Sequence, residues 1–321
     1  MAKEDILKEY RYDGSKKLDL SSVPHDSDGR GGRKEEYAYR TEENIREIDE
    51  LQGKLYAQSQ ESVLIVLQAL DAAGKDSTIK HVLGPLNPQG ISVYSFKSPN
   101  SEEEQHDFLW RYHKRLPQRG KMCVFNRSYY EEVLVVNVHE FWKDYNMPRR
   151  TFHNGKYIEG KYKEIVNWEN YLYGNAFRVV KVFLNLSKDE QKKRFLERID
   201  RSEKNWKFSA NDLKERKYWD KYQRAFEDAI NATATKSCPW YVVPADQKWY
   251  ARYLFSQILV ETLRDIGLPQ AARVECGGAC QVRGNPAERG ISSGTMRDRC
   301  GGASRPLALF REKGYDLWPL A

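Results

Sequence analysis

The chain has 321 residues, 40% of them hydrophobic, and it carries a net charge of +7. This length suits one large α/β domain or two modest ones, and the basic excess favours an anionic partner such as nucleic acid, a membrane surface or phosphate groups. No window approaches the roughly 18 apolar residues of a transmembrane helix, and the N-terminus lacks the apolar segment of a signal peptide, so we expect a cytoplasmic protein.

In chain order, a charged N-terminal stretch precedes an alternation of strand-like and helix-like segments. Residues 1–35 are rich in charged residues, Gly, Ser and Asp and predict an extended arm that is partly ordered by its Tyr and Leu residues. Apolar residues at three- and four-residue spacing predict an amphipathic helix over 40–59. Further strands are expected at 62–68, 91–97, 121–126, 177–186 and 240–245, and further helices after Gly74 and at 101–115, 128–142, 187–201 and 209–231. This alternation predicts a doubly wound parallel sheet of five strands flanked by helices.

The last part of the chain differs in composition from the rest. Residues 269–321 are rich in Gly, Arg and Cys and show no sustained periodicity. Cys276, Cys280 and Cys300 fit no usual zinc spacing, and the segment contains no His. We therefore expect one domain over residues 36–268, followed by a disordered tail.

The sequence ALDAAGKDST, residues 69–78, follows the apolar run SVLIVLQ and precedes a helical pattern. A strand that turns into a helix at Gly74-Lys75 can aim backbone N–H groups and a lysine at a phosphate. The common pattern GxxxxGK[ST] is incomplete, because it would need Gly at Ala69 and Ser or Thr at Asp76. Asp71 inside such a loop is a candidate ligand for Mg²⁺. The alternative is a plain strand–turn–helix corner with a capping Asp.

A second polar cluster follows the predicted strand at 121–126. Asn126 would be a neutral metal ligand at the strand end, and Arg127 can bind phosphate through two parallel hydrogen bonds. Glu131 and Glu132 follow on the next helix, where they could add negative charge near a metal. The same residues also suit an N-capped helix with acids in its first turn, and both interpretations can hold together.

The most highly charged region begins at Ser187, which forms a capping-box pattern with Glu190. Arg194, Arg198 and Arg201 then share one helix face. A break at 202–209 precedes a second basic helix. Paired basic helices after a late strand are typical of a lid that closes over an anionic substrate, here over about residues 190–215. The alternative is a solvated surface helix with Glu–Lys pairs.

Together these segments resemble the polyphosphate kinases of type 2, over about residues 30 to 265. The resemblance is carried by five segments. The first is residues 67–117, which contain the loop and the sequence after it, and the others are FNRSYYEEVLVVNVH, KVFLNLSKDEQKKRFLERI, KNWKFSANDLKER and WYVVPADQKWYARYLF. The detailed pattern looks like the subgroup called class III, described as phosphorylating both nucleoside mono- and diphosphates. The family's own loop reads approximately DxxGK[DG][GS]T, so DAAGKDST is ordinary for it.

The resemblance implies a P-loop kinase-like fold with a helical lid and a specific set of site residues. It implies catalytic roles for Asp71, Lys75, Arg127, Arg194 and Arg198. It implies phosphate or nucleotide binding by Ala72, Ala73, Gly74, Asp76, Ser77, Thr78, Lys97, Asn126 and Glu132. It implies metal binding by Asp71 and Asn126, with Mg²⁺ as the expected ion and Mn²⁺ as an alternative. His106, His113 and His139 are interpreted as packing or substrate-adjacent residues and not as bases.

The function that the resemblance implies is direct, in-line transfer of a terminal phosphoryl group from inorganic polyphosphate to AMP, ADP or both. The expected partners are polyphosphate and adenine or guanine nucleotides, in a dimer or tetramer, without membrane or nucleic acid. Two alternatives stay open from the residues alone. One is an ATP-dependent nucleoside or nucleotide kinase of thymidylate-kinase type, which shares the fold and lid. The other is a basic nucleic-acid-binding protein.

Overall fold

The computed structural model describes residues 5–27, 29, 34–207 and 209–268. The predicted tail, residues 269–321, lies outside these ranges. Within them, strands form one six-stranded sheet in the order β1-β6-β5-β2-β4-β3. The strands are β1 (Arg11–Tyr12), β2 (Ser62–Gln68), β3 (Ile91–Ser95), β4 (Met122–Asn126), β5 (Phe177–Asn185) and β6 (Trp240–Pro244).

The five predicted strands form the parallel part of this sheet, with ends within two residues of those expected. The sixth strand, β1, pairs antiparallel with β6 through Arg11 and Tyr12. One correction follows: the sheet has six strands instead of five, because the N-terminal segment adds a short edge strand. It forms α1 (Asp5–Tyr10) and then β1, and the backbone N–H of Leu18 donates to Asn231 Oδ1 at 2.7 Å.

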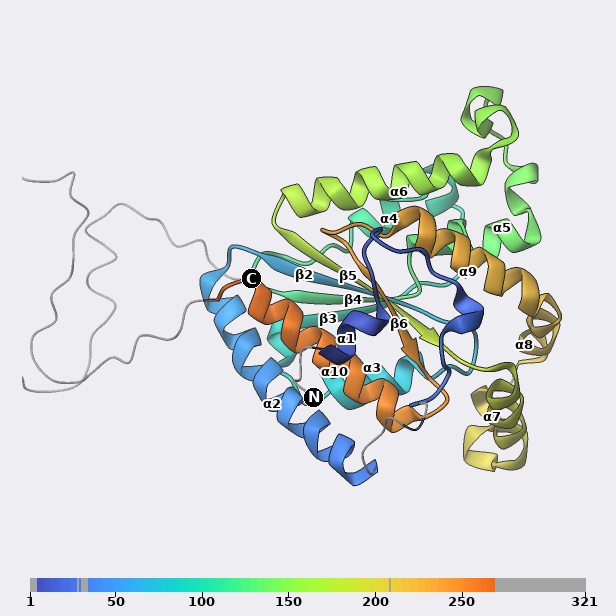
Figure 1. Ribbon diagram of the computed structural model, residues 1–321. Coiled ribbons are helices and arrows are strands. Elements are labelled where there is room, and N and C mark those ends of the chain that lie inside the picture. The colour runs from blue at the N-terminus through green and yellow to red at the C-terminus, as the bar shows by residue number, and fades with distance from the viewer. Residues whose placement is uncertain (1–4, 28, 30–33, 208, 269–321) are drawn as a thin grey trace, which may run out of the picture. The chain divides into compact units, whose positions relative to one another are not determined.

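Alternate residues of the central strand β2 enter two different cores. Val63, Ile65 and Leu67 pack into a cluster with α2 (Lys34–Gln58), α3 (Lys75–Leu83) and α10 (Lys248–Asp265). Leu64 and Val66 pack on the opposite face with α6 (Tyr157–Gly174) and α9 (Trp219–Thr233). Figure 1 shows these helix layers on the two sides of the sheet. A strand buried on both faces needs apolar side chains at every position, which explains the unbroken apolar run in β2.

Several helices are shorter than their sequence patterns predict. Segment 101–115 holds only a 3₁₀ turn (Glu103–Gln105) and α4 (Trp110–His113). Segment 128–142 divides into a 3₁₀ turn (Tyr129–Glu132), α5 (Val135–His139) and a further 3₁₀ turn (Phe141–Asp144). Segment 209–231 divides into α8 (Ala210–Glu215), a 3₁₀ turn (Arg216–Tyr218) and α9. Remaining short 3₁₀ segments are Leu20–Ser22, Pro88–Gly90, Arg149–Gly155 and Ser202–Lys207.

The strand order places a site at the carboxyl edge of the sheet. From β2 the chain proceeds first to β3 and then to β4 on one side, and later to β5 and β6 on the other. Loops that leave the carboxyl ends of neighbouring strands in opposite directions open a crevice there, where open α/β sheets bind ligands. The loop after β2, the segment after β4 and the start of α7 (Lys188–Asp200) all lie at this edge.

Candidate active site

The loop between β2 and α3 has the backbone that a phosphate cradle requires. Gly74, directly before α3, has φ 102° and ψ 22°, a left-handed conformation that suits glycine. A Cβ added there would lie 3.2 Å from Ser77 Oγ. Ala72 also has a positive φ, of 64°, which is uncommon for a residue with a side chain and concentrates at functional sites.

Lys75 is the first residue of α3, and its side chain folds back across the loop. Its Nζ donates to the carbonyl of Ala69 at 2.8 Å. Burial lowers the pKa of Lys75, and the negative charge of Asp71 opposes that shift. A partly desolvated ammonium interacts more strongly with an anion than one in bulk water. The loop therefore combines a preformed turn with a strong point charge.

Arg127 brings the end of β4 to the loop. Its Nη2 lies 3.0 Å from Asp71 Oδ1, and its backbone N–H donates to the Leu67 carbonyl of β2 at 3.1 Å. Arg127 also has a positive φ, of 64°. The Asp71–Arg127 pair is partly exposed, so it adds little to stability. Its importance is positional, because it places a carboxylate and a guanidinium side by side at the mouth of the loop.

Asn126 links the same strand end to α3. Its Nδ2 donates to Asp76 Oδ1 at 2.7 Å and to Ser95 Oγ at 3.3 Å. Its Oδ1 is buried and has no hydrogen-bond partner among the described residues. A buried amide oxygen without a partner is costly, unless a ligand completes it. Asp76 stands where the common loop pattern has Ser or Thr. Its carboxylate accepts the hydrogen bond from Nδ2 and thereby positions the Asn126 side chain.

The oxygen atoms at this edge of the sheet could supply some of the ligands of a magnesium ion. Mg²⁺ is usually held by one or two carboxylates, several waters and the phosphates of the substrate. Asp71 and Asn126 Oδ1 would supply the protein ligands of such a site. In the described part of the chain, no cluster of three or more His, Cys, Asp or Glu residues could hold a metal without other ligands. The residues therefore suit an ion that arrives with phosphate.

The two glutamates after Arg127 face different surroundings. Glu131 Oε1 accepts a hydrogen bond from Gln68 Nε2 at 2.9 Å, and its charge acts on Lys75. Glu132 instead accepts from Tyr157 at 2.5 Å and from Tyr145 at 3.4 Å, and burial raises its pKa. Of the two, Glu131 is the carboxylate that adjoins the loop.

The predicted lid helix α7 begins as its cap pattern indicates, with Glu190 N–H donating to Ser187 Oγ at 3.1 Å. Arg198 Nη1 donates to Asp212 Oδ2 of α8 at 2.9 Å, which joins the two lid segments. Burial raises the pKa of Asp212, and the negative charge of Asp71 raises it further. The charge of Asp71 therefore reaches Asp212, and Arg198 lies beside Asp212.

Arg194 is buried and is held by groups of the protein itself. Its Nη1 donates to the carbonyls of Ala72 and Ala73, both at 3.0 Å. Its Nη2 donates to the carbonyls of Ala245 and Asp246, and its Nε donates to Glu190. A guanidinium has five N–H donors, and each has an acceptor here. In this conformation Arg194 positions the loop.

Four further sequence-based candidates are Lys97 and the histidines His106, His113 and His139. Lys97 is exposed beyond the end of β3. His106 stacks on Trp110, with ring centroids 3.8 Å apart. His113 Nδ1 lies 3.3 Å from Trp168 Nε1, and His139 Nε2 lies 2.8 Å from Glu215 Oε2.

Several residues that shape the site were not among the sequence candidates. Gln68 donates to Glu131, Gln191 Nε2 donates to the Asp71 carbonyl at 3.0 Å, and the negative charge of Asp71 raises the pKa of Asp212. Gln68 and Gln191 are neutral residues in an apolar strand and a charged helix, and only the folded chain brings them to the loop. Asp212 did carry a signal, since it stands in the segment KNWKFSANDLKER that supports the family resemblance.

We expect Arg194→Lys to lower both activity and stability. The substitution keeps the charge but removes most of the five hydrogen bonds, and bonds that involve a charged group contribute about 1.5–3 kcal/mol. Urea unfolding should show a loss of about 2 kcal/mol or more, alongside reduced turnover. Arg198→Lys, at the more accessible lid pair, is the matched control and should change stability less. A variant at Arg194 that loses activity with an unchanged unfolding midpoint would show that Arg194 contacts substrate instead.

A strand–loop–helix turn with a lysine in it, a carboxylate and an arginine at its mouth and the Arg-bearing helix α7 beside it is the arrangement expected of a phosphoryl-transfer enzyme of the P-loop kinase type. Comparison with known proteins gives the family. Residues 32–268 match the model of "Polyphosphate kinase 2 (PPK2)", and the chain belongs to this family.

Similar proteins agree with this assignment. The chain is 47% identical over 260 residues to an ADP-polyphosphate phosphotransferase of Rhodopseudomonas palustris, which covers 81% of this chain and 90% of the relative. It is 40% identical over 263 residues to an AMP/ADP-polyphosphate phosphotransferase of Meiothermus ruber, which covers 82% and 94%. The crystal structure of polyphosphate kinase 2 from Arthrobacter aurescens superimposes with a TM-score of 0.75 at 37% identity, covering 85% of this chain and 93% of that one.

Proposed function

We propose that this protein transfers a terminal phosphoryl group from inorganic polyphosphate to AMP, ADP or both, forming ADP and ATP. The observation that carries the proposal is the loop from Asp71 to Thr78 with Lys75 inside it and Arg127 at its mouth, in a chain of this family. The relatives named as ADP- and AMP/ADP-polyphosphate phosphotransferases support both acceptors.

The geometry supports catalysis by positioning and charge neutralisation. Lys75 and Arg127 would bind the phosphoryl group in transfer, and Arg198 would add positive charge as the lid closes. Arg194 would keep the loop backbone in place. Asp71 and Asn126 would hold Mg²⁺, which would supply positive charge to the phosphates when bound. Phosphoryl transfer requires little covalent chemistry from the protein, so direct in-line attack by a nucleotide phosphate needs no side-chain nucleophile.

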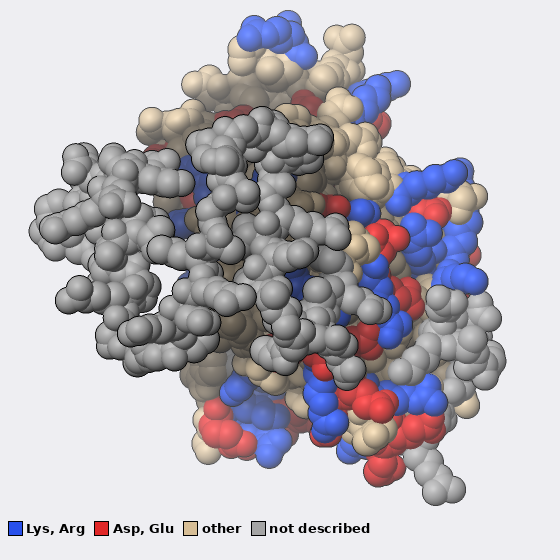
Figure 2. Space-filling model, turned by 90° about the vertical axis from the view of Figure 1, so that its left-hand side faces the viewer, with Lys and Arg blue, Asp and Glu red and all other residues tan. Residues whose placement is uncertain are grey.

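The alternatives are less well supported. The two relatives reported above are named as polyphosphate phosphotransferases, which does not favour an ATP-dependent kinase of the same fold. A nucleic-acid-binding protein would be expected to carry a basic stripe. On the uncovered part of the face in Figure 2, Lys and Arg side chains are mixed with Asp and Glu. None of the described helices is long and apolar enough to cross a membrane. The cytoplasmic location and the dimer or tetramer remain predictions.

The proposal is tested by luminescent detection of ATP in a mixture of protein, long-chain polyphosphate and Mg²⁺ with AMP or ADP. We expect ATP from both acceptors, and no ATP when EDTA removes the metal. ATP from ADP alone would restrict the activity to diphosphates. Absence of ATP with either acceptor would contradict the proposal.

A further inference from the structure

Residues 18–27, here called the strap, precede the family match, which begins at residue 32. The strap is nevertheless fixed to the domain. Its side chains Leu18, Leu20 and Val23 are buried in the hydrophobic cluster that contains α9. Asn231 of α9 holds the strap backbone twice: its Oδ1 accepts the Leu18 N–H at 2.7 Å, and its Nδ2 donates to the Leu18 carbonyl at 2.9 Å.

The later part of the strap holds the turn that joins β6 to α10. The His25 carbonyl accepts the backbone N–H of Asp246 at 2.9 Å, and the Ser27 N–H donates to Gln247 Oε1 at 3.2 Å. Asp246 and Gln247 directly precede α10. Because the strap contributes backbone groups to both bonds, the contact depends on the path of the strap and not on its side chains at these positions.

Asp246 in turn holds α7 at two points. Its Oδ1 accepts the backbone N–H of Ser187, the cap residue of α7, at 2.8 Å, where a carboxylate is also favoured by the helix dipole. Its carbonyl accepts a hydrogen bond from Arg194 Nη2 at 2.9 Å, about two turns farther along the helix. Arg194 then reaches the carbonyls of Ala72 and Ala73 in the phosphate loop. A chain of hydrogen bonds therefore leads from the strap to the loop.

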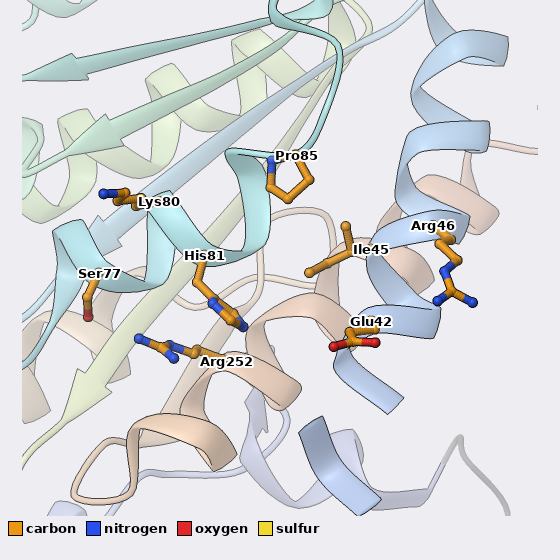
Figure 3. Close-up of a pocket in the computed structure, with 8 residues that line it drawn as sticks. All are labelled: Glu42, Ile45, Arg46, Ser77, Lys80, His81, Pro85 and Arg252. Carbon is orange, nitrogen blue, oxygen red and sulfur yellow. The ribbon is translucent and has the colours of Figure 1, made fainter. Parts of the chain in front are cut away.

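The same turn is connected to the loop through a second helix. α10 begins directly after Asp246 and Gln247 and shares one hydrophobic cluster with α3, the helix into which the loop leads. Figure 3 shows Arg252 of α10 approaching the α3 side chains Ser77 and His81. A displacement of this turn would therefore act on the loop through α7 and on the start of α3 through α10.

We propose that Asp246 is a positioning residue of the active site, which holds the phosphate loop through Arg194 and is itself held by the strap. Its effect on turnover rests on the proposed function. A displacement of about 1 Å in a reacting group can lower a rate about a hundredfold. Replacing Asp246 leaves Lys75 and Arg127 in the chain, so the charges that attract the substrates remain. The expected effect is therefore on kcat more than on KM.

The test measures kcat and KM for ATP formation from ADP and polyphosphate. Asp246→Ala removes the acceptor for the Ser187 N–H and should lower kcat about tenfold or more, with KM changed less than about threefold. Asp246→Asn keeps an oxygen acceptor and should retain most of kcat. Asn87→Ala is the matched control, because it also removes a side chain that caps a backbone N–H, at the 3₁₀ turn before β3, and it should leave kcat unchanged.

A double-variant cycle tests the path through Arg194. Asp246→Ala should lower kcat much less in an Arg194→Lys background than in the intact chain, because the two residues act on the loop in series. Effects that simply multiply would overturn the proposal, since Asp246 would then act independently. An Asp246→Ala enzyme with a lowered unfolding midpoint and an unchanged kcat would also overturn it, because Asp246 would then only cap α7. Circular dichroism melting sets the assay temperature below the unfolding transition of every variant.

Hydrogen exchange tests the same path without relying on activity. Asn231→Ala, which frees Leu18, should speed exchange of the Asp246 amide about fivefold or more, the scale of one lost hydrogen bond. Asp246→Ala should speed exchange of the loop amides of Ala73 and Thr78 in the same way. Unchanged exchange in either variant would overturn the proposal. If the intact chain forms no ATP from polyphosphate, the proposed function fails, and the exchange rates still decide whether the strap and Asp246 position the loop.

Discussion

Lys75→Met is expected to lower kcat for ATP formation from polyphosphate by about a thousandfold or more, the scale observed when a charged or hydrogen-bonding group acting on the transition state is removed. The physical reason is the position of Lys75, folded across the loop with its Nζ 2.8 Å from the Ala69 carbonyl and partly shielded from water. Methionine fills similar space without the charge. The measurement is luminescent ATP detection under saturating nucleotide and polyphosphate.

Lys163→Met serves as the control, since it removes an exposed lysine of α6 away from the loop. It should keep kcat within about twofold of the intact chain, as surface substitutions usually have small effects. Urea unfolding of both variants must show intact folding. A Lys75→Met enzyme that retained a tenth of the original kcat would place the main charge stabilisation on another residue.

Lys181→Met is expected to destabilise the fold by about 3–5 kcal/mol, because it leaves a buried carboxylate without its counter-charge. Lys181 of β5 and Glu169 of α6 are 0% and 1% exposed, and their charged atoms lie 2.6 Å apart. Glu169 also accepts hydrogen bonds from Tyr129 and Tyr130 at 2.7 and 2.9 Å. These tyrosines closely follow Arg127 in sequence, so the pair anchors the segment that carries this candidate active-site arginine.

The free energy of unfolding in urea measures this effect. Lys143→Met is the matched control: it removes one partner of an exposed pair with Glu140, and it should leave the midpoint nearly unchanged. The double variant Lys181→Met, Glu169→Leu should recover part of the loss, since no buried charge then remains unpaired. A loss below about 1 kcal/mol for the single variant would show that water reaches Glu169 and replaces the lysine.

The parallel strands could be predicted from the sequence because their burial on both faces demands continuous apolar runs. The sequence analysis did not predict helices α6 and α10, and for α10 the reason is physical. α10 buries residues around most of its circumference, which removes the polar face that makes a helix recognisable by its period. β1 was missed because a strand of only two residues, Arg11–Tyr12, has no periodicity to detect.

The loop itself could be predicted, since a turn at Gly74 between a strand and a helix is a local property of the sequence. Contacts from distant segments could not. Gln191 and Arg194 reach the loop carbonyls from more than a hundred residues away, and only the packing of α7 against the loop reveals it. The helical face shared by Arg194, Arg198 and Arg201 predicted a common role, yet Arg194 is buried against backbone while Arg201 pairs with Glu203 at the surface.

The identity of the phosphoryl donor is the central claim, and ³¹P NMR of a reaction with ADP as the acceptor tests it most directly. With polyphosphate as the donor, we expect the polymer's internal signals to decline as nucleotide γ-phosphate signals grow, and Lys75→Met should abolish both changes. GTP offered in place of polyphosphate should support little transfer. Efficient transfer from GTP together with an unchanged polyphosphate spectrum would contradict the account and identify an ordinary nucleotide kinase.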